Sequence, residues 1–225
     1  MIPPKRKRRK KLSEEEIQYL LLKYNDQNIV KQYENELEYD IPAGDKLEAK
    51  IENEFKILKG KPLDLYKRFI ELTDEYIKTY EKYVPCKKGC GKCCSIPVEI
   101  ADIERNLIKS FLEKTNNMIN YNCFNKPKEP EIFDGLPGYK YTGTKCPFLN
   151  KDDECSIYPV RPYMCRRHII FNDDNSLCDD YDSKDIVRGR HFYSEIVFMK
   201  IINYYCAKNN FILRHYDIRD AFEKL

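Results

Sequence analysis

The feature that most constrains this chain is a dense run of cysteines near the middle of the sequence. The run reads Cys86-Lys-Lys-Gly-Cys90-Gly-Lys-Cys93-Cys94. Gly89 and Gly91 allow the backbone to turn sharply, so that several sulfur atoms can point at one centre. Neighbouring side chains point in different directions, so we expect Cys93 and Cys94 to serve one ion together only if the backbone there is unusual.

A second and wider group of cysteines follows in a proline-rich stretch. Its members are Cys146, Cys155, Cys165 and Cys178. Pro147, Pro159 and Pro162 stiffen the loops that carry these thiols, and stiff loops lose less entropy when they enclose a centre. A single cysteine of this kind would be interpreted as a small buried hydrophobic residue. The eight cysteines of these two groups, all between residues 86 and 178, instead predict a shared site.

The whole chain contains 10 cysteines among 225 residues, 42% of which are hydrophobic. That is enough apolar material to fold without disulfide bonds. The basic start leads into Leu12-Ser13-Glu14 with no apolar segment, so we expect no secretory signal and a cytoplasmic location. In a reducing cytosol, a metal explains clustered thiols better than a disulfide framework or incidental buried thiols, which remain the alternatives.

Charge and hydropathy limit the partners of the chain. No apolar run approaches the roughly 20 residues of a membrane-spanning helix, so we expect no membrane segment. Lys5 to Lys11 are seven consecutive basic residues, and they leave 33 Lys and Arg against 37 Asp and Glu in the rest of the chain. A strongly basic body is therefore excluded. Nucleic acid, acidic lipid or an acidic protein partner could be attracted only by this tail, which is otherwise a solvated segment.

Hydrophobic periodicity predicts a mainly α fold. Ser13 and Glu16 form a capping-box pattern before an apolar stripe. We expect helices over residues 13–39, 45–59, 62–84, 99–115, 185–209 and 217–224. Ile41-Pro42 should end the first helix, and residues 116–184 should be irregular and held by metal.

Together these patterns predict a helical N-terminal extension plus an irregular cysteine-rich metal-binding module packed on helices. The expected boundaries are a disordered basic tail over residues 1–12, the helical extension over 13–84, and the cysteine-cluster domain with its C-terminal helices over 85–225.

The cysteine segments resemble a known family. They are the run from Cys86 to Cys94, followed by Cys146-Pro-Phe-Leu and Cys155-Ser-Ile-Tyr-Pro-Val-Arg-Pro-Tyr-Met-Cys165-Arg. They resemble the CxxCxxCC cysteine-cluster family (YkgJ-like proteins), described as a zinc- or iron-chelating domain, over about residues 84–180. The first gap here is three residues, where the family name implies two. The same module resembles part of flagellin lysine N-methylases, longer enzymes for which the resemblance implies an iron–sulfur cluster.

We expect the metal ligands among the clustered thiols. The candidates are Cys86, Cys90, Cys93, Cys94, Cys146, Cys155, Cys165 and Cys178. Structural zinc usually shows two close cysteine pairs, and the second group has none. Uneven spacing favours a [4Fe–4S] cluster, with zinc as the alternative. Nearby cations can offset the negative charge of such a centre; they are Lys87, Lys88, Lys92, Arg161, Arg166 and Arg167. His168 is a further possible ligand, or a surface histidine.

Three functions fit these observations. The first is a metal-binding protein with a structural or redox role, in which a [4Fe–4S] cluster is favoured. The second is a zinc-binding module associated with nucleic acid or a protein partner. The third is a protein-modifying, lysine N-methylase-like enzyme that uses the cluster. The sequence contains no Ser-His-Asp, phosphate-loop or dinucleotide pattern, and catalytic residues are not identified.

Overall fold

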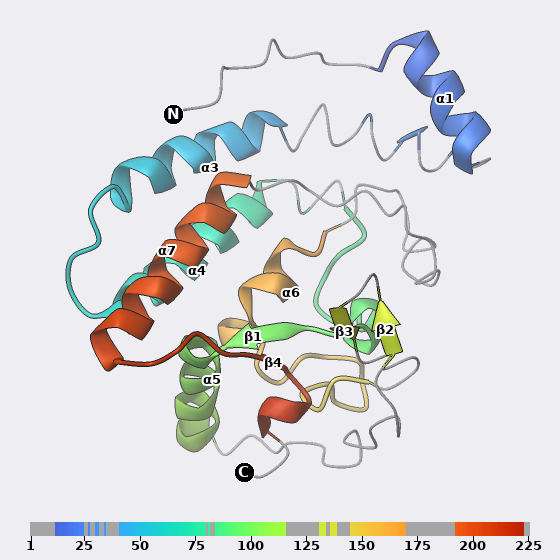
Figure 1. The fold of residues 1–225 in the computed structure, drawn as a ribbon. Coiled ribbons are helices and arrows are strands. Elements are labelled where there is room, and N and C mark those ends of the chain that lie inside the picture. Colours follow the sequence, from blue (N-terminus) through green and yellow to red (C-terminus); the bar gives the residue numbers. More distant parts are fainter. Residues whose placement is uncertain are drawn as a thin grey trace.

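The computed structural model describes residues 12–24, 27, 30–31, 34, 41–79, 81, 84–115, 131–133, 136–138, 145–169 and 192–222. Within these ranges the protein is mainly helical, as predicted (Figure 1). The basic stretch from Lys5 to Lys11, as well as Cys123 and Cys178, lies outside them.

The first described helix, α1 (Glu14–Tyr24), starts at the predicted capping box. The backbone N–H of Glu16 donates to Ser13 Oγ at 3.2 Å. In return, the Ser13 N–H donates to Glu16 Oε2 at 2.9 Å. Two N–H groups that the helix itself cannot satisfy are thereby paired. The predicted continuation of this helix to residue 39 falls largely outside the described residues.

The next helix, α3 (Ile41–Glu54), starts earlier than predicted. We expected this helix to start at residue 45, but Ile41 and Pro42 form its first turn. Proline is tolerated there because the N–H groups of the first turn have no partner within the helix. The expected end of the preceding helix before Ile41-Pro42 lies outside the described residues.

Helix α4 (Pro62–Lys78) starts at the predicted proline but ends before the predicted residue 84. Thr79 follows it, and both its N–H and its hydroxyl donate to the carbonyl oxygen of Tyr76, at 3.0 and 2.7 Å. The apolar stripe on α4 is buried as expected, and Tyr66, Phe69 and Tyr76 are all in the core.

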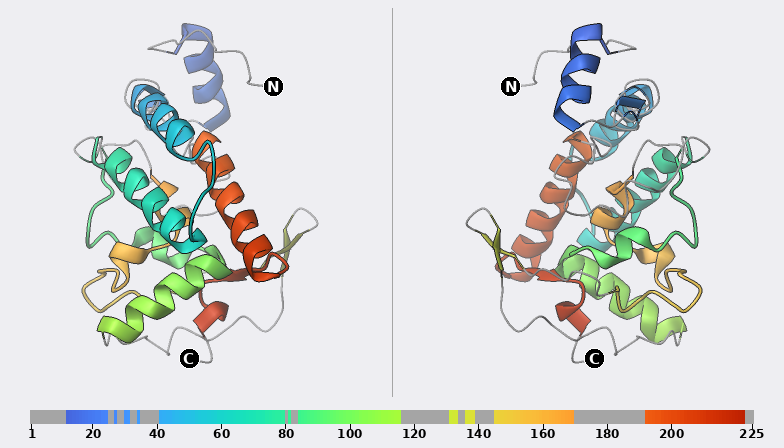
Figure 2. Two further views of the ribbon diagram at one scale, coloured as in Figure 1. Left: turned by 90° about the vertical axis from the view of Figure 1, so that its left-hand side faces the viewer. Right: turned by 90° about the vertical axis from the view of Figure 1, so that its right-hand side faces the viewer.

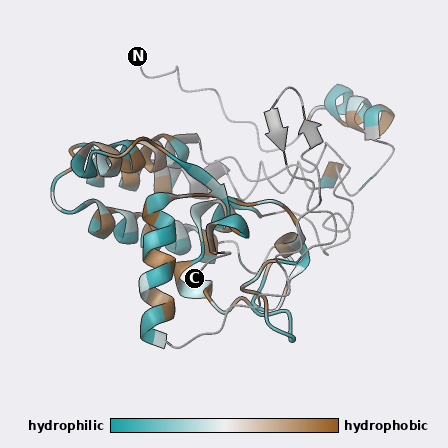
Figure 3. Cartoon of the chain, turned by 60° about the horizontal axis from the view of Figure 1, so that its bottom comes forward, coloured by the Kyte–Doolittle hydropathy of each residue, from teal (hydrophilic) through white to brown (hydrophobic). Residues whose placement is uncertain are grey.

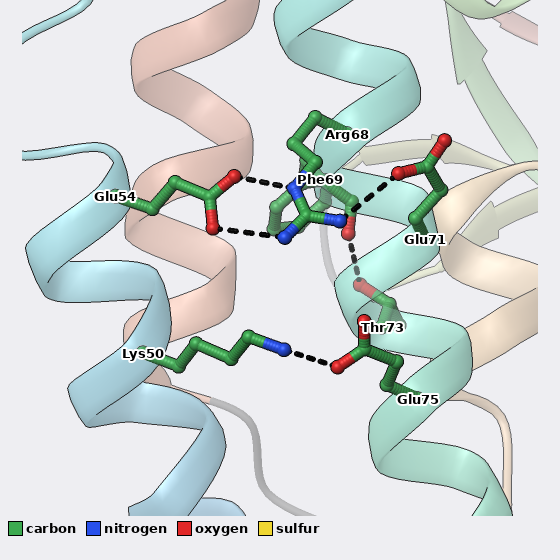
Figure 4. A network of polar contacts seen from close by, with 7 residues as sticks. All are labelled: Lys50, Glu54, Arg68, Phe69, Glu71, Thr73 and Glu75. Atoms are coloured by element: carbon green, nitrogen blue, oxygen red, sulfur yellow. Dashed lines mark hydrogen bonds and ion pairs between the residues drawn. The ribbon is translucent and has the colours of Figure 1, made fainter.

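Polar contacts join the exposed faces of α3 and α4 (Figure 4). Arg68 donates to Glu54, with Nη2 at 3.2 Å from Oε2, and to Glu71 at 3.1 Å. Lys50 reaches Glu75 in a second pair. These groups are solvent-exposed, so the pairs contribute little to the free energy of unfolding. Apolar burial between the two helices contributes more.

The larger hydrophobic core lies between α3, α4 and α7 (Phe192–Asn209), which run side by side in Figures 1 and 2. The short helix α6 (Tyr163–Arg167) joins this core through one aromatic side chain. The ring centroid of Tyr163 lies 4.6 Å from that of Phe198 and 5.1 Å from that of Phe69. The helix that carries Cys165 is thereby anchored on the helical layer.

A small antiparallel sheet pairs β1 (Glu99–Ala101) with β4 (His215–Asp217), in the register Glu99↔Asp217. The predicted helix over 99–115 is therefore shorter, because its first three residues pair as a strand before α5 (Asp102–Thr115) begins. The predicted helix over 217–224 is also wrong. Its described residues supply the end of β4 and one 3-10 turn, η7 (Asp220–Phe222).

A second hydrophobic core packs beneath this sheet and against α5. Its fully buried members include Ile100, Ile157 and Phe222, and the rings of Phe148 and Phe222 meet edge-on at 5.1 Å. A separate hairpin, β2 (Glu131–Phe133) with β3 (Leu136–Gly138), lies in the stretch predicted to be irregular.

In Figure 3 the described helices carry both hydrophilic and hydrophobic positions. None of the helices in the described ranges combines the length and the apolar character needed to cross a membrane.

Candidate metal centre

Two glycines shape the first cysteine run for different reasons. Gly89 has a φ of 86°, a left-handed conformation that favours glycine, and the turn is closed by a hydrogen bond of 3.0 Å from Cys90 N–H to Lys87 O. Gly91 has little space around it. A Cβ atom there would lie 3.1 Å from Asp153 Cβ, on the loop of the second cysteine group. The first glycine allows the turn and the second allows the two loops to approach.

The two cysteine groups are joined through their backbones. The N–H of Cys146 donates to the carbonyl oxygen of Cys94 at 2.7 Å. Leu149 and Cys155 then form an isolated antiparallel bridge that folds the second loop back on itself. The chain continues through the 3-10 turn η5 (Tyr158–Val160) to Pro162, after which α6 carries Cys165.

Seven of the eight predicted ligand residues line one cavity of about 150 Å³. They are Cys86, Cys90, Cys93, Cys94, Cys146, Cys155 and Cys165. The eighth, Cys178, lies outside the described residues. His168 also lines the cavity. Cys206 does not; it is buried in α7 and packs in the larger core.

Cys93 and Cys94 both face this cavity although they are adjacent in the chain. They lie in a 3-10 helix, η3 (Lys92–Ser95), rather than in a strand or an α-helix. A hydrogen bond between the two side chains, together with burial, raises the pKa of Cys93 well above its usual value. The 3-10 backbone thus lets two adjacent side chains line the same cavity.

Three further thiols have raised pKa values, and burial is the main cause in each case. They are Cys146, Cys155 and Cys165. Each of the three side chains is half-buried because it faces the cavity. A negative charge on Cys155 or Cys165 raises the pKa of Cys146 further, and Cys93 and Cys155 do the same for Cys165. These thiols are thus close enough to act on one another, and a bound cation would favour their thiolate forms.

The described thiols line the cavity but do not form a ready site for a single ion. Among the described Cys, His, Asp and Glu residues, no three form a group that could hold a single metal ion as they stand. The donor type nevertheless fits metal binding, because soft thiolate ligands suit zinc and iron–sulfur centres.

The predicted cations differ in what they contact. Arg161 lines the cavity, and its positive charge lowers the pKa of Cys93, Cys155 and Cys165 against the effect of burial. Arg166 also lines the cavity and its charge lowers the pKa of Cys155, but its guanidinium is held by Asp74 on α4 and by the carbonyl oxygens of Pro159 and Arg161.

Three other predicted cations pair with carboxylates or are exposed to solvent. Arg167 pairs with Glu195, and Lys88 lies 3.4 Å from Glu154. Lys87 lines the cavity but is solvent-exposed.

The sequence analysis did not identify Glu104, which holds helix α6 in place. The carboxylate of Glu104 is 1% exposed and accepts hydrogen bonds from Tyr66 Oη at 2.7 Å, Ala101 N–H at 2.8 Å and Tyr163 N–H at 2.9 Å. The last of these lies in the first turn of α6, so Glu104 fixes the helix that carries Cys165. Its place on the apolar face of α5, between Ile103 and Leu107, was a usable signal.

A second missed residue is Arg219, which follows β4 and is 1% exposed. It donates to the carbonyl oxygens of Cys94 and Ile96 and pairs with Asp217. No local sequence pattern indicates such a contact, because the C-terminal segment and the cysteine run meet only in the folded chain.

A comparison with protein families gives one match to this chain. The family described as "CxxCxxCC: Putative zinc- or iron-chelating domain" matches residues 85–207. Comparisons with curated proteins and with solved structures found no match. The matched region covers more than half of the chain and contains all seven cysteines that line the cavity. The protein therefore belongs to the CxxCxxCC family of zinc- or iron-chelating cysteine-cluster domains.

Proposed function

We propose that this protein binds a [4Fe–4S] cluster through Cys93, Cys146, Cys155 and Cys165, and that the cluster has a structural or redox role. The observation that carries this proposal is the single cavity of about 150 Å³ lined by seven thiols from two distant segments. Thiols that converge from residues 86–94 and 146–165 suit a centre that crosslinks these segments.

The choice of four ligands rests on which thiols act on one another. A negative charge on Cys93 raises the pKa of Cys155. Charges on Cys155 and Cys165 raise the pKa of Cys146, and charges on Cys93 and Cys155 raise the pKa of Cys165. All four line the cavity, and burial contributes to the raised pKa of each. Cys94 is hydrogen-bonded through its side chain to Cys93, the thiol that acts on Cys155 and Cys165. We assign Cys94, together with Cys86 and Cys90 of the same cavity, supporting positions.

The arrangement of the described donors favours a cluster over a single ion. A tetrahedral zinc site with zinc–sulfur bonds of about 2.3 Å needs sulfur atoms about 3.8 Å apart. No three described donors form a group that could hold one ion. The thiolates of a [4Fe–4S] cluster bind different iron atoms, so they stand further apart around a larger core.

A bound cluster would supply a rigid crosslink and a site for one-electron transfer. The residues of this chain would hold it. The hydrogen bond from Cys146 N–H to Cys94 O keeps the two cysteine groups together, while Glu104 and Arg219 fix α6 and the first cysteine run. Metal ligation would then stabilise the fold, because the unfolded chain has no preformed site.

Purification without oxygen tests this proposal directly. We expect about four iron and four sulfide ions per chain, a brown colour and an absorption band near about 400 nm. Stoichiometric zinc without iron would contradict the cluster and would support the alternative zinc-binding module. If carefully handled protein contains neither iron nor zinc, metal binding itself is disproved.

A further inference from the structure

One cation beside the thiols is held unusually firmly. The guanidinium carbon of Arg161 lies 4.2 Å from the centroid of the Tyr158 ring, within the distance of a cation–π contact. The backbone N–H of Arg161 lies 3.5 Å from Tyr158 O. The backbone carbonyl oxygen of Arg161 accepts a hydrogen bond of 2.9 Å from Arg166 Nε. Side chain and backbone are both fixed, so the position of this charge is set before any metal binds.

The charge of the same side chain acts on the thiols. Arg161 lines the thiol cavity, and its charge lowers the pKa of Cys93, Cys155 and Cys165. Its Nε is buried and has no hydrogen-bond partner in the part of the chain that the structure describes. Because Nε has almost no accessible surface, it cannot donate into the cavity, and the guanidinium acts on the cavity through its charge.

The competing cations are already engaged or exposed. Arg166 also lines the cavity, but its guanidinium is held by Asp74 and two carbonyl oxygens, and Arg167 pairs with Glu195. Lys87 lines the cavity but is exposed to solvent, which weakens its field at the thiols. Stacking leaves the charge of Arg161 intact, because an aromatic ring does not neutralise it.

We propose that Arg161, held in place by Tyr158, is the positioning residue whose fixed charge compensates the negative charge of the bound centre. This inference rests on the proposed metal centre but does not depend on which metal occupies it. Four thiolates give an anionic centre with either zinc or iron–sulfur. Replacing a residue that supports the metal ligands without ligating the metal typically lowers metal affinity by about 10- to 100-fold.

The test compares variants by the half-time of metal release to an excess of chelator, with iron and zinc measured by elemental analysis. Arg161→Gln should release metal about tenfold faster than the unchanged protein. Arg161→Lys should recover part of the loss, because it keeps the charge but not the planar group that stacks. Tyr158→Phe keeps the ring face and should match the unchanged protein, whereas Tyr158→Leu should resemble Arg161→Gln.

Arg105 provides a matched control. Its guanidinium carbon lies 5.7 Å from the centroid of the Tyr216 ring and its Nε donates to Ala221 O, but it does not line the cavity. Arg105→Gln should leave the release rate unchanged. In a protein that contains the cluster, Arg161→Gln should also lower the midpoint reduction potential, a shift that a purely structural role would not cause.

The outcomes separate this inference from the proposed function. If the unchanged protein contains metal but Arg161→Gln, Arg161→Lys and Arg105→Gln all release it at the rate of the unchanged protein, only the role of Arg161 fails. If Arg161→Lys releases metal as fast as Arg161→Gln and Tyr158→Leu has no effect, the stacked charge is not what matters and the inference is overturned. If the unchanged protein contains no metal at all, the proposed function fails first.

Discussion

Nη2 of Arg219 donates a hydrogen bond of 3.3 Å to the backbone carbonyl oxygen of Cys94, across 125 positions of the sequence. The same nitrogen lies 3.1 Å from Ile96 O, and Nη1 lies 3.3 Å from both carboxylate oxygens of Asp217. The C-terminal segment therefore stabilises the backbone at the end of the first cysteine run through these hydrogen bonds.

Replacing Arg219 with Met should weaken both the fold and the metal site. Asp217 would be left buried without its charge partner, and breaking such a pair typically costs about 3–5 kcal/mol. The two carbonyl oxygens would also lose their donor. Chemical denaturation and the metal content of the purified protein measure the two effects. Arg214→Met, an exposed change in the same segment, should alter neither, and equal losses in both variants would contradict this account.

The proposed ligands predict a graded cysteine series. Replacing Cys93, Cys146, Cys155 or Cys165 singly with Ser should remove most of the metal, because a serine hydroxyl binds soft metals poorly. The same changes should lower the thermal stability of the metal-loaded protein, since metal binding and folding are coupled. Elemental analysis and a thermal melt with and without chelator check both effects.

Two other cysteines serve as controls for this series. Cys90→Ser alters a thiol that lines the cavity but lies outside the proposed ligand set, so most of the metal should remain. Cys206→Ser lies in the larger core and should leave the metal content unchanged while lowering stability. Full metal retention after replacement of Cys165 would disprove the ligand assignment.

Neighbouring carboxylates on α4 should differ sharply in their importance. Asp74 pairs with Arg166, whose side chain is 1% exposed, whereas Glu75 pairs with Lys50 on the surface. Asp74→Asn should destabilise the fold by about 2 kcal/mol, less than for a fully buried pair, because Asp74 is itself partly exposed. Glu75→Gln should cause no measurable change in the denaturation midpoint. Equal midpoints for the two variants would mean that Arg166 does not depend on Asp74.

Glu104 should make stability depend on pH. Burial raises its pKa, so the folded state holds the proton of Glu104 more tightly than the unfolded state does. Its contribution to stability is therefore largest below the ordinary glutamate pKa and falls as the pH rises through the raised value. The groups facing it are the Tyr66 hydroxyl, two backbone N–H groups and, further away, the charge of His215.

Glu104→Gln tests this expectation. The amide can replace only one carboxylate oxygen as an acceptor, so the variant should lose about 1–3 kcal/mol of unfolding free energy. The loss should grow as the pH falls from neutral towards the ordinary glutamate pKa, because only the unchanged protein takes up the proton. Urea denaturation at several pH values measures it, with Glu113→Gln on the exposed part of α5 as the control. A difference that is independent of pH would show that Glu104 does not titrate in this range.

Helix α4 and the first turn of α1 were predictable because their signals are local. The stripe through Tyr66, Phe69 and Tyr76 repeats at helical spacing, and the pairing of Ser13 with Glu16 spans a single turn. Glu99 to Ala101 were predicted as helix because their pairing partner, β4, lies more than 110 residues away. A short strand without a nearby hairpin leaves no periodic trace.

The cysteine spacing by itself determined that this chain carries a thiol-rich site, because so many soft donors at short separation have few other uses. It could not determine which thiols meet, since spacing along the chain does not fix distance in space. Only the folded structure placed Cys93, Cys146, Cys155, Cys165 and Arg161 around one cavity. It also brought Glu104 and Arg219 into contact with the backbone of the segments that carry these thiols. Those placements come from contacts between distant segments, and the packing of the two cores decides them.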